Sequence, residues 1–265
     1  MSAADSHFDI PTNKITGVSD AQAQLDFAYH SAISASRFPG PNYFANLQLI
    51  HDHLKAETYL EIGVAGAGSL RMAGYNCFAI GIDPGFTIST SIKAWTKLFY
   101  LPSDDYFAQH DTREILGGRP VALSFIDGLH TFDQVFRDLL NVMPYLAPTS
   151  HVILHDVYPV HALPAERERH SVFWTGDVWK VLFLIKEFLP QLEFTTIPTA
   201  PSGLLLLKGF DGKKPEIDAQ KLSDRVGELL QEKYDDHSPD LPKRLNLGLN
   251  SAEYIREWLD TPAGQ

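Results

Sequence analysis

Short apolar runs alternate with amphipathic stretches through the middle of the chain. The apolar runs predict five strands, of which the third is the weakest: residues 58–63, 78–83, 105–109, 121–127 and 151–156. The stretches between them carry apolar residues at helical spacing and predict helices: residues 69–75, 88–101, 112–117 and 131–146. Strands and helices that alternate in this way are typical of a parallel sheet covered by helices. We therefore expect an α/β protein with a Rossmann-like, doubly wound, mostly parallel sheet.

The two ends of the chain have other patterns. Helical stripes at 19–37 and 42–55 predict an N-terminal helical extension. Beyond the fifth strand, the pattern predicts an amphipathic helix at 177–188 and then an antiparallel pair at one sheet edge, residues 193–198 and 203–208. Two charged helical pieces follow, at 217–234 and 251–259. These patterns divide the chain into three expected units: a helical extension (1–57), a Rossmann-like domain (58–210) and a C-terminal helical tail (211–265).

Composition excludes several classes of protein. The chain has 22 Lys and Arg against 33 Asp and Glu, a net charge of −11, which argues against a protein that binds nucleic acid by neutralising phosphates. A single cysteine, Cys77, rules out an intrachain disulfide. No apolar run approaches the roughly 20 residues of a membrane span, and residues 1–9 lack the pattern of a signal peptide. We expect a cytoplasmic protein with no nucleic-acid or membrane partner.

The first chemical motif runs from Tyr59 to Ser69. Glu61 lies near the end of a predicted strand, and a loop of small residues with the spacing Gly-x-x-Gly-x-Gly follows it. Glycines let the backbone approach a ligand closely, and a helix N-terminus offers free N–H groups to an anion. Asp83 ends the next strand, where an acid can accept hydrogen bonds from ribose hydroxyls. The motif indicates a nucleotide site, and a glycine-rich turn before an ordinary helix is the alternative.

The second set of residues follows the last two predicted parallel strands. Asp127 and the pair His155-Asp156 end these strands, and His130 lies three residues beyond Asp127. Because ligands of open α/β sheets bind at the carboxyl ends of the strands, we expect these four residues to share a crevice with the first motif. Carboxylates with an imidazole suit a divalent cation, and an imidazole suits a general base at neutral pH. The alternatives are that Asp127 caps the next helix and that His155 and Asp156 are a buried, metal-free pair.

Together the two motifs resemble class I S-adenosylmethionine (SAM) methyltransferases of the small-molecule O-methyltransferase type. This family is related to the macrolide sugar O-methyltransferases and the cephalosporin-hydroxylase-like proteins. The residues that carry the resemblance are Glu61-Ile62-Gly63, Asp83, the stretch 126–139, Leu146-Ala147-Pro148 and His155-Asp156. The chain departs from the family at His155, where the best-known metal-dependent members have a carboxylate, and at Ala67, where the family has its loop glycine.

The resemblance implies a SAM-dependent methyltransferase that acts on a hydroxyl of a small-molecule acceptor. Its implied catalytic residues are His130, as the base, and Asp156; Mg²⁺ or another divalent cation would be bound by Asp127, His155 and Asp156. The implied cofactor-binding residues are Glu61, Gly63, Ala65, Gly66, Ser69, Asp83, Asp111, Thr112 and Asp127. A homo-oligomer is expected as well.

Two other functions compete with this interpretation. An NAD-type oxidoreductase is disfavoured by the glycine spacing and by the absence of a second domain for the nicotinamide side. A SAM-fold protein without methyl transfer, acting as a binding or assembly subunit, would use the terminal helices as contacts. The irregular stretch 157–174 is long enough to be a substrate lid, while Asp177 as a helix cap and Trp179 as a core residue are the plainer interpretation.

Overall fold

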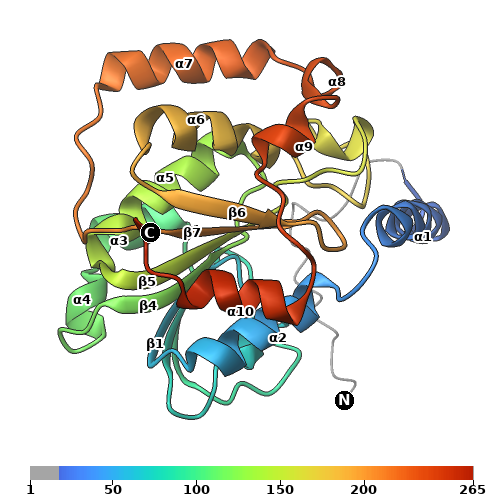
Figure 1. Ribbon diagram of the computed structural model, residues 1–265. Helices are drawn as coiled ribbons and strands as arrows, with labels where there is room; N and C mark the ends of the chain where they lie inside the picture. The colour runs from blue at the N-terminus through green and yellow to red at the C-terminus, as the bar shows by residue number, and fades with distance from the viewer. Residues whose placement is uncertain (1–17, 265) are drawn as a thin grey trace, which may run out of the picture.

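The computed structural model describes residues 18–264 and has a seven-stranded sheet at its centre (Figure 1). The strand order is β3-β2-β1-β4-β5-β7-β6. The strands are β1 (Thr58–Ile62), β2 (Phe78–Ile82), β3 (Trp95–Phe99), β4 (Val121–Ile126), β5 (Leu146–His155), β6 (Glu193–Ile197) and β7 (Leu204–Lys208). Strand β7 is antiparallel to both β5 and β6, and the pairs from β3 to β5 are parallel. This confirms the Rossmann-like, mostly parallel sheet with a hairpin at one edge.

Apolar side chains on both faces of the sheet are buried, as expected of strands covered by helices on each side. One face packs with α5 (Phe132–Val142) and α6 (Val181–Phe188) in one core cluster. The other face packs with α2 (Tyr43–Leu54) and α10 (Ala252–Asp260) in a second cluster. All five residues of β1 are buried, so the strand that leads into the glycine loop lies at the centre of the core.

The third strand lies elsewhere than the sequence pattern predicts. The predicted strand at 105–109 is part of the helix α3 (Ser103–Gln109), and the predicted helix at 88–101 contains β3 instead. Two acids in the first turn of α3 favour a helix there because they interact well with its N-terminal dipole. Strand β3 is a sheet edge that pairs only with β2, and its Trp95 is 81% exposed. An edge strand with exposed residues lacks the continuous apolar run that predicts the buried strands.

The helices between the first three strands are shorter than predicted. The segment 69–75 forms only a single 3₁₀ turn, Leu70–Met72, and residues 83–94 connect β2 to β3 without a helix. The later crossovers agree better with prediction, since α4 (Thr112–Ile115) and α5 lie within the expected ranges. The glycine loop is therefore covered by an irregular segment, which affects the shape of the pocket described below.

The terminal segments pack around this core. Helix α1 (Asp20–Arg37) begins at a Ser19 capping box and stands out from the body of the protein (Figure 1). The last helices are α7 (Ala219–Gln231), α8 (Tyr234–His237), α9 (Leu241–Arg244) and α10, which lies beside α2. Residues 1–17 of the expected N-terminal extension, including the segment tested for a signal peptide, lie outside the described residues. The division into three units stays a prediction.

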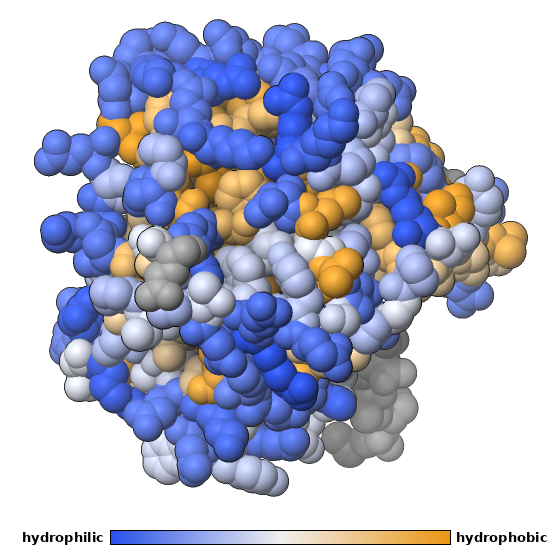
Figure 2. All heavy atoms as spheres, in the orientation of Figure 1, coloured by the Kyte–Doolittle hydropathy of each residue, from blue (hydrophilic) through white to orange (hydrophobic). Residues whose placement is uncertain are grey.

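Helix α1 carries an apolar surface. Figure 2 shows orange side chains gathered over this helix, and its Leu25, Phe27 and Tyr29 are 71%, 54% and 64% exposed. Exposed apolar patches often mark partner surfaces. The expected homo-oligomer stays a prediction. Within residues 18–264, no helix is both long and apolar enough to cross a bilayer.

Candidate functional site

The glycine loop begins where β1 touches the end of β4. Gly63 has a φ of +90°, and a Cβ atom at this position would lie 1.9 Å from the carbonyl oxygen of Asp127. Only glycine allows this contact. The backbone N–H of Ala65 donates a 2.8 Å hydrogen bond to Asp83, whose other carboxylate oxygen accepts from the N–H of Gly85 at 2.6 Å. Asp83 therefore ties the glycine loop to the end of β2.

Glu61 supports the loop from inside the core. Its side chain is fully buried and accepts hydrogen bonds from the hydroxyls of Tyr59, at 2.6 Å, and Ser69, at 2.8 Å. Burial raises the pKa of Glu61 to about 8, although both hydroxyl bonds act in the opposite direction. The predicted acid thus anchors the far end of the loop, through Ser69, to β1.

A pocket of about 450 Å³ opens between the glycine loop and the start of α2. Its lining residues are Tyr43, Phe44, Gly63, Val64, Ala65, Gly66, Gly68, Ser69, Arg71, Ser89, Thr90 and Asp127. Five of the nine residues predicted to bind the cofactor are among them: Gly63, Ala65, Gly66, Ser69 and Asp127. Of the remaining four, Glu61 and Asp83 hold the loop from behind.

The other two, Asp111 and Thr112, have structural partners away from the pocket. Asp111 is the N-cap of α4 and accepts hydrogen bonds from the N–H groups of Arg113 and Glu114. Thr112 is fully buried, and its hydroxyl lies 3.0 Å from the hydroxyl of Tyr106. The prediction placed them after a third strand at 105–109, which the structure shows to be a helix. Their role in cofactor binding stays a prediction without support from the geometry.

Sequence reasoning did not select several of the lining residues. Tyr43 and Phe44 come from α2, and Ser89 and Thr90 come from the connection between β2 and β3. The ring of Phe44 packs so closely on Gly68 that a Cβ there would lie 3.2 Å from it. The sequence offered one sign that α2 could line a pocket, namely two adjacent aromatic residues at the start of the predicted helix. Ser89 and Thr90 lay inside a helix that does not form.

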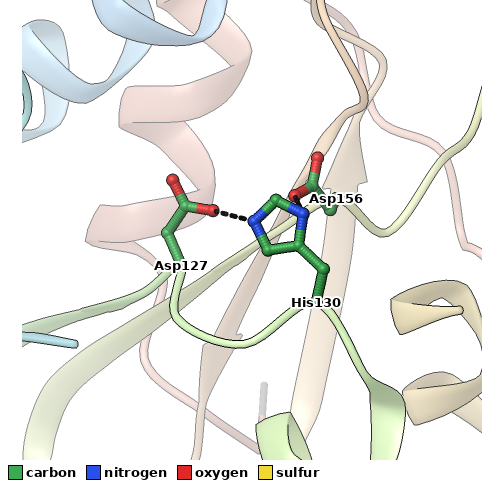
Figure 3. A group of neighbouring side chains, drawn as sticks. All are labelled: Asp127, His130 and Asp156. Carbon is green, nitrogen blue, oxygen red and sulfur yellow. Dashed lines mark ion pairs between the residues drawn. The ribbon is translucent and has the colours of Figure 1, made fainter. Parts of the chain in front are cut away.

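Asp127, His130 and Asp156 converge at the carboxyl ends of β4 and β5 (Figure 3). His130 lies between the two carboxylates: its Nε2 is 3.7 Å from Oδ1 of Asp127, and its Nδ1 is 3.1 Å from Oδ2 of Asp156. The structure thus brings Asp127, His130 and Asp156 together, whereas Glu61, which was expected to share their crevice, is buried in the core behind the loop. Asp127 also lines the pocket, so it links the three side chains to the glycine loop.

Hydrogen bonding decides which nitrogen of His130 carries the proton. Its Nδ1 lies 2.8 Å from the carbonyl oxygen of Trp174, which can only accept, so Nδ1 must be the donor. The ring of Trp174 also stacks on the imidazole, with centroids 5.1 Å apart. Gly176 allows the approach of this segment, because a Cβ there would lie 1.8 Å from the carbonyl oxygen of His130. In the neutral imidazole, Nε2 therefore has a free lone pair.

His155 lies behind this group, at 7% exposure. Its Nδ1 is 3.0 Å from Oδ1 of Asp127 and 3.4 Å from Oδ1 of Asp156, and its ring stacks on Tyr43 with centroids 4.5 Å apart. Burial alone would lower the pKa of His155, but the two carboxylates outweigh it and raise this pKa well above its ordinary value. A protonated His155 thus compensates much of the negative charge of the pair.

Asp156 has an unusual backbone and an unsatisfied oxygen. Its φ is +61°, a left-handed conformation that is uncommon outside glycine and that occurs often at functional sites. The hydroxyl of Ser202 donates a 2.5 Å hydrogen bond to Oδ1. Oδ2 is buried and accepts no hydrogen bond from any residue of the described range, because the Nδ1 proton of His130 is directed at Trp174.

These residues also fit a divalent cation. Asp127, His130 and Asp156 each offer one ligand atom, and these atoms lie within 4.8 Å of one another. Two carboxylates and an imidazole are ligands for Mg²⁺, Mn²⁺ or Fe²⁺, and the unsatisfied oxygen of Asp156 is available to one. The predicted ligand His155 lies beside the same two carboxylates, with its Nδ1 3.0 Å from Asp127 and 3.4 Å from Asp156, and the predicted ligand set stays a prediction.

One family model matches part of the chain. Residues 60–157 match the family model of a methyltransferase domain, a range that runs from β1 to just beyond β5 and includes Glu61, Asp83, Asp127, His130 and Asp156. The protein therefore contains a methyltransferase domain, and the resemblance seen in the sequence is confirmed. No curated protein matches the chain in sequence.

Solved structures with a similar fold include several methyltransferases. The O-methyltransferase of Bacillus cereus in complex with S-adenosylhomocysteine (SAH) is 14% identical, with a TM-score of 0.45 over 74% of this chain and 93% of its own. TomG of Streptomyces achromogenes with SAM is 14% identical, with a TM-score of 0.46 over 70% and 89%. MycE of the mycinamycin pathway with Mg and SAH is 14% identical, with a TM-score of 0.46 over 72% and 57%. These similarities are distant, and the match of residues 60–157 to the methyltransferase-domain model is the stronger finding.

Proposed function

We propose that the protein transfers the methyl group of SAM to a hydroxyl of a small-molecule acceptor and that His130 is the base. The observation that carries this proposal is the hydrogen bond from Nδ1 of His130 to Trp174, which leaves Nε2 free to take a proton. The His130 side chain is 27% exposed, so an acceptor can reach it. Its position beside Asp127, at the edge of the glycine-loop pocket, brings base and cofactor pocket together.

In this proposal the cofactor supplies the activated methyl group, and the protein aligns the ligands and removes the proton. When bound, SAM supplies a methyl group already activated on a sulfonium, so the main task of the protein is alignment. The glycine loop and Asp127 line the pocket in which the two ligands meet. His130 takes the hydroxyl proton at Nε2 and becomes an imidazolium, which Asp127 and Asp156 stabilise on either side.

A divalent cation would be held by Asp127 and Asp156, the two carboxylates of the group. Bound there, it would supply positive charge that lowers the pKa of an acceptor hydroxyl. Oδ1 of Asp127 is at present engaged with His155, so a cation would compete with that imidazolium for the same oxygen. We propose the metal as an aid to the reaction and His130 as the base in either case.

The corrected position of β3 also moves the candidate adenine site. In the family that the sequence resembles, the adenine lies after the third strand, which is why Asp111 and Thr112 were predicted to bind the cofactor. In this structure the third strand ends at Phe99 rather than at residue 109. Tyr100 follows it, is 59% exposed, and makes an edge contact with Phe86 at 5.3 Å. We therefore propose Tyr100, in place of Asp111 and Thr112, as the residue beside the adenine.

The test compares His130→Ala with the wild-type protein. Methyl transfer is followed as SAH formed with a panel of catechols, sugars and phenols, and SAH affinity is measured by calorimetry. A general base contributes about 10²–10⁴-fold, so turnover should fall by about that factor while SAH affinity stays within about twofold. His170→Ala is the matched control, because His170 is an exposed histidine whose ion-pair partner among the described residues, Glu168, lies in its own loop. A parallel loss of SAH binding, or unchanged turnover, would reject the assignment.

A further inference from the structure

The pocket has opposite charges on different lining residues. Among the residues that line it, Arg71 is the only Lys or Arg and Asp127 is the only acid. Arg71 lies in the 3₁₀ turn Leu70–Met72, directly after the glycine loop, and its side chain is exposed. The proposed mechanism uses Asp127 and gives Arg71 no role.

Arg71 has unused hydrogen-bonding capacity. Within residues 18–264, its side chain has one hydrogen-bond acceptor, the hydroxyl oxygen of Thr90, which lies 3.2 Å from Nη1. No carboxylate of the described residues lies within ion-pair distance of its guanidinium, although the chain has more acids than bases. A guanidinium carries five N–H donors in a planar fork, so most of them remain available to a ligand.

The pocket wall that contains Ser89 and Thr90 is held in place by hydrogen bonds to the backbone of the glycine loop. Because no helix forms between β2 and β3, the segment 87–90 lies along the glycine loop. The N–H of Thr87 donates to the carbonyl of Ala65 at 3.0 Å, and Ser89 donates to the carbonyl of Gly66 from its N–H, at 3.3 Å, and from its hydroxyl, at 3.2 Å. These bonds fix Thr90 where its hydroxyl can orient the guanidinium. The position of the Arg71 guanidinium therefore depends on two segments, the 3₁₀ turn that contains Arg71 and the segment that contains Thr90.

We propose that Arg71, oriented by Thr90, binds a carboxylate group of a pocket ligand. A guanidinium matches the two oxygens of a carboxylate, and such charge-assisted pairs are among the strongest hydrogen bonds in proteins. Two ligands could bring this group: the methionine carboxylate of SAM, or a carboxylate on the acceptor. The inference rests on the proposed function, in which both ligands share the pocket.

The first arm of the test removes the charge from Arg71 and the carboxylate from the cofactor product. Calorimetry measures the binding of SAH and of its decarboxylated analogue, S-adenosyl-3-thiopropylamine, to wild type, Arg71→Gln and Arg71→Lys. If the cofactor is the source, Arg71→Gln weakens SAH binding by about 10–100-fold and leaves the analogue unchanged, and Arg71→Lys restores part of the loss. Arg256→Gln, on the exposed side of α10, is the control and should bind both ligands as wild type.

The second arm addresses the acceptor. The SAH complex is titrated with 3,4-dihydroxybenzoate and with catechol, which differ by one carboxylate. If the acceptor is the source, wild type prefers 3,4-dihydroxybenzoate by at least tenfold, Arg71→Gln loses this preference, and SAH binding is unchanged.

Two results overturn the assignment. One is wild-type SAH affinity in Arg71→Gln together with no preference of the wild-type complex for 3,4-dihydroxybenzoate. The other is an equal loss of SAH and of its decarboxylated analogue, which would show that Arg71 supports the loop rather than the carboxylate. Failure of the wild-type protein to bind SAH would contradict the proposed function instead, so the two failures are distinguishable.

Discussion

Replacing Gly63 by alanine tests how closely the cofactor pocket depends on the contact between β1 and β4. A Cβ at Gly63 would lie 1.9 Å from the carbonyl oxygen of Asp127, while real Cβ contacts are at least 3.0 Å, so the two backbones must separate by about 3.0 − 1.9 = 1.1 Å. The φ of +90° adds strain of about 1–3 kcal/mol, and overpacking adds about another 1–3 kcal/mol. Both segments line the pocket, so their separation should lower SAH affinity by at least tenfold.

Gly118 is a matched control for this substitution. Its φ is +85°, nearly the same as that of Gly63, but a Cβ there would meet no atom within 4 Å. Gly118→Ala should therefore show only the backbone strain and bind SAH as wild type. Thermal unfolding measures the difference, since about 1 kcal/mol shifts the midpoint by about 2–4 °C in a chain of this size. The reasoning is refuted if the two variants unfold at the same temperature or if Gly63→Ala binds SAH normally.

Two further predictions concern residues outside the pocket. Burial raises the pKa of Glu61 from 4.5 unfolded to about 8 folded, so the folded state holds the extra proton and stability falls as the pH rises from about 4.5 to 8. Glu61→Gln should remove this pH dependence of the free energy of unfolding, which amounts to at most about 5 kcal/mol between pH 4.5 and 8. Urea unfolding at several pH values measures it, and an unchanged pH dependence in the variant would contradict the prediction. Asp26 of α1 accepts hydrogen bonds from the N–H groups of Val172 and Phe173, next to the Trp174 carbonyl that orients His130. Asp26→Asn should lower stability by about 1–3 kcal/mol and turnover several-fold, while SAH affinity stays unchanged. The control Asp20→Asn, at an exposed position of the same helix, should leave stability and turnover unchanged. Equal turnover in the two variants would show that α1 does not position the base.

Local patterns were sufficient for the central part of the fold. Strands β1, β2, β4 and β5 are continuous apolar runs that end in polar residues, and this pattern predicted both the sheet and the convergence of Asp127, His130 and Asp156. Strand β3 was missed because it is an edge strand that pairs with one neighbour and leaves Trp95 exposed. Such a strand depends on tertiary pairing more than on its own pattern.

The site was harder to predict wherever it depends on contacts between distant segments. The carbonyl of Trp174 fixes the tautomer of His130 across 44 residues, and no local pattern indicates that bond. Likewise, Glu61 was expected to face the cofactor, but the hydroxyls of Tyr59 and Ser69 hold it in the core. Arg71 and Thr90 meet only because the predicted helix between β2 and β3 does not form.

The most direct test of the account is calorimetric titration of SAH into metal-stripped protein, repeated with Mg²⁺ present. The account predicts micromolar binding of SAH in the glycine-loop pocket without metal. It also predicts that binding of Mg²⁺ is lost in the double variant Asp127→Asn with Asp156→Asn. Absence of SAH binding under both conditions would contradict the methyltransferase function at its foundation. In that case the pocket beside His130 would belong to a protein that binds or assembles without transferring a methyl group.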